Sequence, residues 1–210
     1  MNIINVISDM PRKGKWERRT EVDTAVIHHS VGPSLPKEGT LQHLKNIANY
    51  HIREKGDISI AYHYVIDGNG NVYQTNDVYD LTWHGHGSNT TGIGICLLGD
   101  FTEAPPNDTQ LAAARGLVHL LQLDHGISKV IGHRQAPRAN TACPGKAFTN
   151  KMIMELLSDN NKSVITSVRW NAEEVVRTLE KMNLNDELKA MRLNLVDKVI
   201  TPLAALEKSL

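Results

Sequence analysis

Residues 24–30, TAVIHHS, decide the fold class of this chain. A short apolar run that stops at polar residues is typical of a buried strand. Two further runs, 61–66 (AYHYVI) and 91–98 (TGIGICLL), have the same character, and we expect the second of them to be central in a sheet. The turn sequence DGNGN at 67–71 joins the run 61–66 to a returning strand at 72–74, which predicts a hairpin.

Helical periodicity separates these strands. Apolar residues spaced three and four apart predict helices, with Thr40 and Asn107 as N-terminal caps of the first two. Residues 1–20 show neither pattern, and we expect them to be irregular. The expected elements after the first strand are helices at 41–53, 107–125 and 147–157 and a short strand at 130–131. Strands interleaved with helices indicate an α/β domain.

The C-terminal quarter of the chain differs in pattern. Residues 158–167 (SDNNKSVITS) are short and polar, which is typical of a linker. Beyond them we expect two amphipathic helices, the first capped by Asn171 and the second ending at Pro202. The predicted organisation is therefore a main domain at 1–157, a linker at 158–167 and a helical module at 168–210.

The balance of charge disfavours nucleic acid and membranes as partners, although it does not exclude a local basic patch. Lys plus Arg and Asp plus Glu number 23 each, so no net field draws the chain to nucleic acid or to an anionic membrane. No apolar stretch reaches the roughly 20 residues that span a bilayer. The N-terminus lacks the basic and apolar regions of a signal peptide, so we expect synthesis in the cytoplasm.

Three residues carry the donor types of a catalytic metal site. His28 ends the first strand, His133 begins a loop, and Cys143 follows ten positions later. Two imidazoles and a thiolate are good zinc ligands, and three protein ligands leave the fourth position open. Each also has a structural interpretation, as a hydrogen-bonded strand-end histidine or a packed cysteine. Cys96 lies inside an apolar strand, and we expect it to belong to the core.

Five motifs in one order carry a family resemblance. They are VIHHS at 26–30, AYHYVI at 61–66 with its DGNG turn, His84 with NTTGIG at 89–94, GHR at 132–134, and TACPG at 141–145. Together they resemble the zinc-dependent N-acetylmuramoyl-L-alanine amidases, a family shared by amidase-type phage lysozymes and peptidoglycan recognition proteins. The resemblance covers about two-thirds of the chain. It implies a central mixed β-sheet flanked by helices, to which the small C-terminal helical module is added.

The resemblance implies one Zn²⁺ ion per chain, held by His28, His133 and Cys143. It favours His28 over His29 because the family's ligand directly follows the apolar strand. Alternation along a strand also places these two side chains on opposite faces. Gln135 stands where the family often has Asp or Glu, which leaves the route of the proton open.

Further roles follow from the matched motifs. Tyr62 corresponds to a tyrosine beside the metal, and Thr141 falls where a hydroxyl donates to the developing oxyanion, so both are expected to be catalytic. His84 and Asn89 correspond to positions that line the substrate groove. Arg138, in the loop before Thr141, either meets a carboxylate of the substrate or is solvated.

The implied activity is hydrolysis of the amide bond between the lactyl group of N-acetylmuramic acid and L-alanine by a zinc-activated water. Peptidoglycan is then the partner. The missing signal peptide and the helical module favour a phage endolysin that reaches the wall through a membrane lesion and lyses the host. The helical module would bind the wall, mediate self-association or pack on the main domain.

Other interpretations stay open at this stage. A non-catalytic peptidoglycan recognition module is the first alternative, although such proteins usually lack the cysteine ligand that Cys143 provides. A cytoplasmic wall-recycling amidase is an alternative biological setting, and a regulatory partner function is neither supported nor excluded. A zinc peptidase is disfavoured because the chain contains no HExxH motif.

Overall fold

The structure, a computed structural model, describes residues 3–157 and, beyond them, 169–170, 172–173, 175–178, 189–190, 193–194 and 196–209. Contacts divide the chain into two compact units, residues 2–157 and residues 158–210. The predicted linker at 158–167 lies outside the described residues. In the described part of the chain, no helix is long and apolar enough to cross a membrane.

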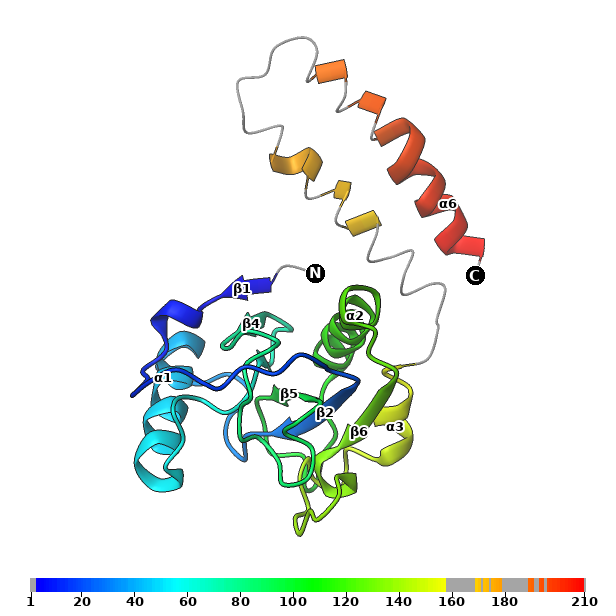
Figure 1. The fold of residues 1–210 in the computed structure, drawn as a ribbon. Coiled ribbons are helices and arrows are strands. Elements are labelled where there is room, and N and C mark those ends of the chain that lie inside the picture. Colours follow the sequence, from blue (N-terminus) through cyan, green and yellow to red (C-terminus); the bar gives the residue numbers. More distant parts are fainter. Residues whose placement is uncertain are drawn as a thin grey trace. The chain divides into compact units, whose positions relative to one another are not determined.

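A six-stranded sheet forms the centre of the first unit, in the order β1-β4-β3-β5-β2-β6 (Figure 1). Its strands are β1 (Ile3–Asn5), β2 (Thr24–His29), β3 (Tyr64–Ile66), β4 (Val72–Gln74), β5 (Gly92–Leu97) and β6 (Lys129–Gly132). β2 runs parallel to both of its neighbours, whereas β3 and β4 form an antiparallel hairpin. The sheet is therefore mixed, and β5 lies in its interior, as the sequence predicts.

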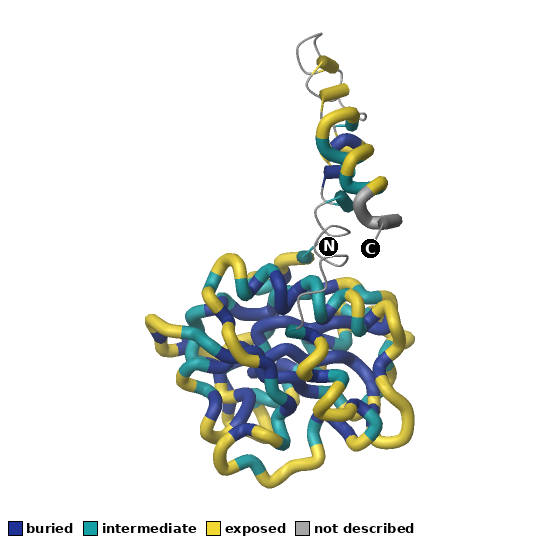
Figure 2. Tube along the Cα trace, turned by 90° about the vertical axis from the view of Figure 1, so that its right-hand side faces the viewer, coloured by how far each residue is buried: buried dark blue, intermediate teal, exposed yellow. Residues whose placement is uncertain are grey.

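Helices cover both faces of this sheet. α1 (Thr40–Tyr50) lies on one side, and α2 (Asp108–His125) and α3 (Asn150–Met154) lie on the other (Figure 1). The strands between them are buried, and exposure is concentrated in the surrounding loops (Figure 2). This arrangement confirms the predicted α/β class with a central mixed sheet flanked by helices.

The α1 side of the sheet contains the core that supports the end of β2. Leu44 and Ala48 of α1 pack on Val65 and Cys96 of the sheet, and all four side chains are fully buried. In the register of the parallel strands, Val65 pairs with Cys96 and Cys96 pairs with His28. Residues paired in this way direct their side chains to the same face. His28 therefore faces the α1 side, and the prediction that Cys96 is core is confirmed.

Two predicted helices differ from the observed ones at their ends. Thr40 is the first residue of α1 and not its cap, because its hydroxyl donates to Asp67 and Gly39 occupies the cap position. α1 ends at Tyr50 and continues as a π-helical turn, η2 (His51–Lys55). α3 begins later than expected because the Thr149 side chain accepts the Met152 amide and caps the helix there, and it also ends earlier, at Met154.

Two strand predictions also change. Residues 3–5 form the edge strand β1, although the sequence predicts an irregular segment at 1–20. The strand escapes prediction because three residues are too few to show a period. The run 61–66 forms a ladder strand only from Tyr64, because the Tyr62 carbonyl accepts from the side chains of Thr75 and Asn76 instead of from a strand.

Within the second unit, the predicted helix end at Pro202 is wrong. A π-helical turn, η4 (Val196–Ile200), leads into α6 (Thr201–Ser209), and Pro202 lies in the first turn of α6. The predicted cap Asn171 lies outside the described residues.

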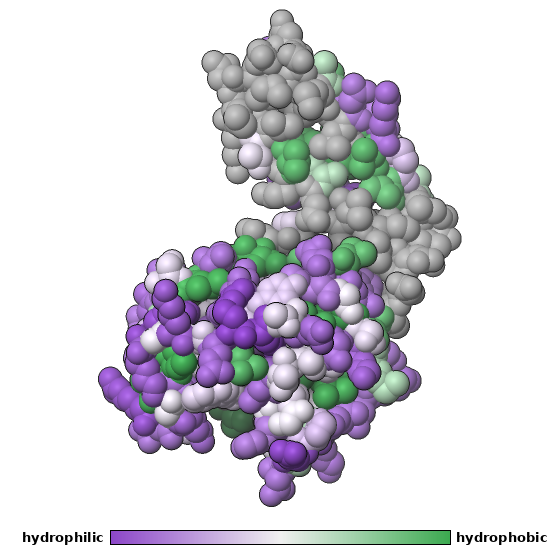
Figure 3. Space-filling model, in the orientation of Figure 1, coloured by the Kyte–Doolittle hydropathy of each residue, from purple (hydrophilic) through white to green (hydrophobic). Residues whose placement is uncertain are grey.

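The surface of the first unit is mainly hydrophilic on the face shown in Figure 3, with apolar residues in small patches. Scattered exposed apolar side chains are normal for folded proteins. The hydropathy of this face therefore does not by itself mark a partner site.

Asp67 ties the β3–β4 hairpin to α1. Its carboxylate, 2% exposed, accepts from the backbone amides of Asn69 and Asn71 at 3.0 Å each. It also accepts from the Thr40 hydroxyl at 3.0 Å. Because α1 forms one wall of the region beside β2, this carboxylate helps to fix that wall.

Replacing Asp67 with Ala is expected to lower the free energy of unfolding by about 2 kcal/mol, because several part-buried hydrogen bonds lose their shared carboxylate acceptor. Urea titration followed by circular dichroism measures the change. Asp124→Ala, at an exposed carboxylate on α2, is the control and should stay within about 0.5 kcal/mol of wild type. Equal stability of the two variants would show that the Asp67 network does not hold the hairpin.

Candidate metal centre

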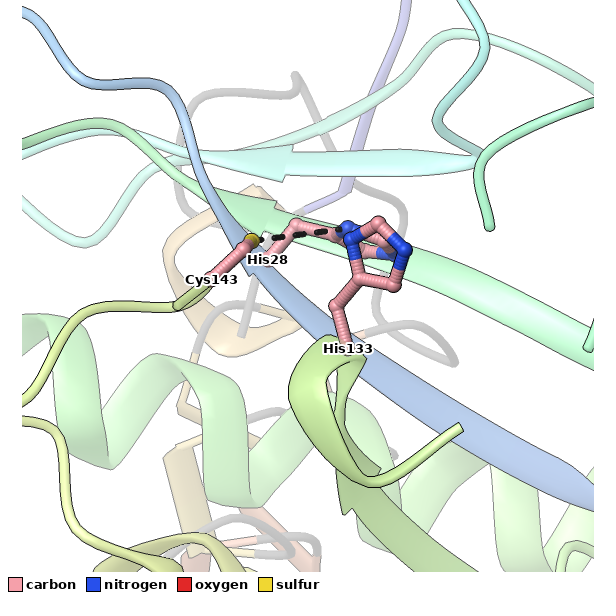
Figure 4. Close-up of side chains that lie close together, drawn as sticks. All are labelled: His28, His133 and Cys143. Carbon is pink, nitrogen blue, oxygen red and sulfur yellow. Dashed lines mark hydrogen bonds between the residues drawn. The ribbon is translucent and has the colours of Figure 1, made fainter. Parts of the chain in front are cut away.

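Three side chains from separate segments converge at the C-terminal end of β2 (Figure 4). His28 comes from the end of β2, His133 from the turn η3 (His133–Gln135) that follows β6, and Cys143 from the loop after it. One ligand atom from each of the three lies within 4.8 Å of the others. The fold thus brings His28, at the end of β2, close to two residues that follow it by more than one hundred positions in the sequence.

The donor set fits a tetrahedral zinc ion, and its spacing is slightly wider than a bound ion would hold. Zn–N bonds of about 2.0 Å and Zn–S bonds of about 2.3 Å place tetrahedral ligand atoms about 3.3–3.6 Å apart. The distance from His28 Nδ1 to Cys143 Sγ is 3.8 Å. Two nitrogens and one sulfur are also the ligand types that zinc prefers. The residues present therefore suit Zn²⁺, with three protein ligands.

Backbone hydrogen bonds hold Cys143 in place. The His29 amide donates to Cys143 Sγ over 3.5 Å, and the Arg134 amide donates to the Cys143 carbonyl over 2.8 Å. The Thr141 hydroxyl accepts from the Cys143 amide at 3.1 Å. Burial raises the pKa of Cys143 to about 11, so the metal-free protein carries a thiol and not a thiolate.

His84 lies behind His28. His28 Nε2 and His84 Nδ1 are 3.1 Å apart, and His84 Nε2 is 2.8 Å from the carbonyl oxygen of Gly92. The His84 ring is 6% exposed and packs against β5 at Gly94, where an added Cβ would lie only 2.7 Å from His84 Cγ. Burial lowers the pKa of His84 to about 3, so its ring is neutral.

A buried polar layer continues beneath His84. His63 is fully buried, accepts from the Gly94 amide at 2.9 Å and lies 2.9 Å from the Asp80 carbonyl. Arg19, 8% exposed, donates to the carbonyl oxygens of Asn89 and Gly92 at 2.7 Å each. Burial lowers the pKa of Arg19 to about 10, which still leaves it charged at neutral pH. This guanidinium fixes the start of β5 and the loop before it.

A cleft of about 570 Å³ opens over the three converging side chains. Its walls come from the end of β2, from α1 with η2, and from the loop that carries Cys143. The lining residues are His28, His29, Ser30, Val31, Asn46, Ile47, Tyr50, His51, Lys55, Tyr62, His84, His133, Thr141 and Cys143. A second hollow shares His51, Lys55, Tyr62 and His84 with it and extends along Asp57, Trp83, His86 and Asn89. The two hollows adjoin, and we refer to them together as the groove.

The structure brings most of the predicted site residues to this groove. Tyr62 and Thr141 line it beside Cys143, and Asn89 lines its extension. Asn89 also accepts from the Gly85 amide at 2.8 Å, which braces its loop. Arg138 is exposed, has a φ of 65° and is not among the lining residues.

His84 lines the groove, as the sequence predicts, but it is also held from inside the protein. It reaches the groove wall, yet both of its ring nitrogens are engaged inside the protein. His29, the other member of the histidine doublet, turns its ring away and accepts the Phe101 amide at Nδ1 over 3.4 Å. Its backbone amide, in contrast, supports Cys143.

Tyr62 lies at the junction of the groove and the core. Its ring centroid is 5.2 Å from that of His28 and 5.5 Å from that of His51. Burial, together with the nearby Cys96 and Cys143 thiols, raises the pKa of Tyr62 well above its usual value. The phenol therefore keeps its proton and remains a hydrogen-bond donor at neutral pH.

Sequence reasoning did not assign Arg19 or His51 to the site. His51 lines the groove and accepts the Ala61 amide at 3.0 Å, while Arg19 acts from below through backbone carbonyls. Both contacts join residues that no local pattern connects. For His51 the sequence offers one signal, the high number of histidines, 10 in all, but this number does not indicate which histidines lie close together. For Arg19 we find no such signal.

Comparison with known proteins places this fold and site in context. A family model described as N-acetylmuramoyl-L-alanine amidase matches residues 18–146. Peptidoglycan-recognition protein SD of Drosophila melanogaster is 35% identical over 134 residues, which cover 61% of this chain and 70% of that protein. An N-acetylmuramoyl-L-alanine amidase of Sus scrofa is 30% identical over 136 residues, covering 60% of this chain and 22% of that protein.

A solved structure agrees with these matches. The crystal structure of Drosophila peptidoglycan recognition protein SD superposes with a TM-score of 0.63 and 28% sequence identity. The superposition covers 70% of this chain and 90% of that one. The similarity thus extends over the unit that contains the His28, His133 and Cys143 cluster.

Metal affinity is expected to rise with pH. Because Cys143 has a pKa of about 11 without metal, Zn²⁺ must displace one proton from the thiol throughout the range from pH 6.5 to 9. The association constant should then increase about tenfold per pH unit. Chelator competition at several pH values measures it, and proton release on binding gives an independent count. An affinity independent of pH would contradict a thiol ligand.

The metal-free protein is expected to lose stability in acid. Burial lowers the pKa of His28 and His63, and it lowers that of His51 to about 4 and that of His84 to about 3. The unfolded chain binds protons at these histidines below about pH 6.5 while the folded protein does not. The contribution of these histidines to the free energy of unfolding should be fully present above that pH and should decrease as the pH drops towards 4. Urea unfolding at pH 7.5, 6.5 and 5.5 tests this, and a constant free energy would contradict it.

Proposed function

Because this chain belongs to the N-acetylmuramoyl-L-alanine amidase family, we propose that it is a zinc-dependent amidase acting on peptidoglycan. The proposed reaction is hydrolysis of the amide that joins the lactyl group of N-acetylmuramic acid to L-alanine. The observation that carries the proposal is the convergence of the ligand atoms of His28, His133 and Cys143 at the floor of a groove. A protein that only recognises the wall has no need of such a donor set.

The three ligands divide the work of holding the ion. His28 and His133 supply neutral imidazoles, since burial lowers the pKa of both rings. Cys143 supplies a thiolate once its proton has left, and the His29 amide then stabilises the sulfur charge. When bound, Zn²⁺ supplies Lewis-acid polarisation of a carbonyl and lowers the pKa of water.

The Thr141 hydroxyl in the groove suits the charge that develops on the scissile carbonyl. The Thr141 hydroxyl uses one lone pair to accept the Cys143 amide, so its hydrogen stays available to a substrate oxygen. Tyr62 lines the same groove and stays protonated because burial raises its pKa, while its hydroxyl is hydrogen-bonded to Cys96 at the edge of the core. Preorganised donors of this kind stabilise an oxyanion more than they stabilise the ground state.

The groove also extends beyond the metal centre, as a polymer substrate requires. It continues from the metal centre along a wall that includes Trp83, which is 51% exposed, and the polar side chains of Lys55 and Asn89. An exposed indole ring with polar neighbours offers both a stacking surface and hydrogen bonds. We place the glycan and stem peptide of peptidoglycan along this groove.

We further propose that the enzyme acts as a phage endolysin, made in the cytoplasm and released to the cell wall. The second compact unit, residues 158–210, supports this setting because a lytic enzyme gains residence time from a module that binds the wall or pairs two enzymes. A recognition module without activity is the alternative function, and it is favoured by the name of the relative in Drosophila melanogaster.

Replacing Cys143 with Ser is expected to abolish both zinc retention and hydrolysis, because a buried hydroxyl is a poor substitute for a thiolate ligand. Elemental analysis should fall from about one zinc per chain to less than about a tenth. Release of peptides with N-terminal L-alanine from purified peptidoglycan should be lost as well.

Cys96→Ala is the matched control, since Cys96 is fully buried in the core and lies outside the ligand group. It should keep its zinc at a small cost in stability. Full zinc loading with no cleavage of several wall types by the wild-type protein would support recognition instead of catalysis. Full activity of the Cys143→Ser variant would refute the ligand assignment.

A further inference from the structure

His28 and His84 form a chain of ring nitrogens that ends on a backbone carbonyl. The chain runs from His28 Nε2 to His84 Nδ1 over 3.1 Å, and from His84 Nε2 to the Gly92 oxygen over 2.8 Å. A carbonyl oxygen can only accept a hydrogen bond, so His84 Nε2 must carry its hydrogen. A neutral imidazole has one hydrogen, and His84 Nδ1 is then an acceptor.

The hydrogen of His28 follows from this order. Because His84 Nδ1 accepts, His28 Nε2 must donate, and His28 Nδ1 is left with a free lone pair. That nitrogen is the one that lies 3.8 Å from Cys143 Sγ. The Gly92 carbonyl thus determines, through two rings, which nitrogen of His28 faces the metal centre.

We propose that His84 is a positioning residue of the metal centre: it fixes His28 in the tautomer and ring orientation that present Nδ1 to a metal ion. It acts through His28 and contacts neither metal nor substrate. The proposal rests on the zinc site of the proposed function, and it replaces the sequence-based expectation that His84 binds substrate.

The protein surrounds His84 with features that suit this role. An added Cβ at Gly94 would lie 2.7 Å from His84 Cγ, and one at Gly92 would lie 3.3 Å from His84 Cε1. Gly94 therefore leaves the space that the ring fills, whereas at Gly92 the nearest atom is the Ser88 carbonyl oxygen, at 2.3 Å. The Gly92 oxygen is itself held by Arg19 over 2.7 Å, so the end of the chain is anchored to a buried guanidinium.

A role in substrate binding fits these contacts poorly. A histidine that binds substrate needs a ring nitrogen free to reach it, and both nitrogens of His84 are engaged. Only 6% of the residue is exposed, although it forms part of the groove wall. Partners behind a metal ligand typically change metal affinity by about 10–100-fold when they are removed.

Two variants distinguish the hydrogen-bond acceptor of His84 from the space that its ring fills. His84→Phe fills the space beside Gly94 but offers no acceptor to His28. His84→Asn places an amide oxygen at the position of Nδ1 and restores the acceptor. His43→Gln, at a histidine on α1 that is bonded to Glu38, is the control away from the groove. Circular dichroism and thermal unfolding establish that each variant is folded.

Zinc affinity, measured by chelator competition on the whole chain, is the first readout. We expect His84→Phe to bind zinc about 10–100-fold more weakly, His84→Asn to recover most of that loss, and His43→Gln to match wild type. The second readout is the nitrogen NMR spectrum of the metal-free wild-type protein, in which His28 should carry its hydrogen on Nε2. In steady-state kinetics at saturating zinc, KM should stay close to the wild-type value.

Several results would overturn the proposal. They are wild-type zinc affinity in folded His84→Phe, equal weakening in both variants, a hydrogen on Nδ1 of His28 in the metal-free protein, or a raised KM with unchanged zinc affinity. If His84→Phe does not fold, the tautomer of the wild-type protein and the His84→Asn affinity decide. Failure of the amidase proposal is distinct from these outcomes, since it would appear as wild-type protein that binds zinc without cleaving peptidoglycan.

Discussion

The parallel pairing of β2 with β5 and β6 is the constraint on which the rest of the site depends. It places His28 opposite Cys96 and directs its side chain to the α1 side of the sheet. The same pairing brings β6 beside β2, so that the turn after β6 delivers His133 and the following loop delivers Cys143. A shift of β2 by one residue would exchange His28 for His29 and turn the ligand to the opposite face. The metal centre is thus a product of strand register.

The buried polar network beneath the groove is the second requirement of the fold. His63, His84 and Arg19 lie in an interior where unpaired polar groups cost free energy, and each is satisfied largely by backbone groups of β5 or the loop before it. This network leaves the rings neutral and fixed while Arg19 stays charged. The groove above it therefore has a rigid floor, which is the condition for holding a metal and a substrate in defined positions.

Much of this fold follows from sequence pattern, and some of it does not. Strands β2, β5 and β6, the hairpin at Asp67 and the cap of α2 at Asn107 follow from local periodicity and turn chemistry. Strand β1 and the true start of α1 do not, because a three-residue edge strand has no period and Thr40 bonds across the chain to Asp67. The ligand cluster was recognised by family resemblance. The resemblance also placed His84 at the groove, but its contact with His28 could not be predicted, since that contact depends on the space left by Gly94, which only three-dimensional structure shows.

X-ray absorption at the zinc edge of the zinc-loaded protein tests the central claim most directly, because it reports the donor atoms themselves. The account predicts one sulfur at about 2.3 Å and two imidazole nitrogens at about 2.0 Å, with a lighter donor completing four-coordination. The sulfur contribution should disappear in Cys143→Ser, if any zinc is retained, and persist in Cys96→Ala. A wild-type spectrum without sulfur, or with two or more sulfurs, would contradict the assignment of His28, His133 and Cys143 as the metal ligands.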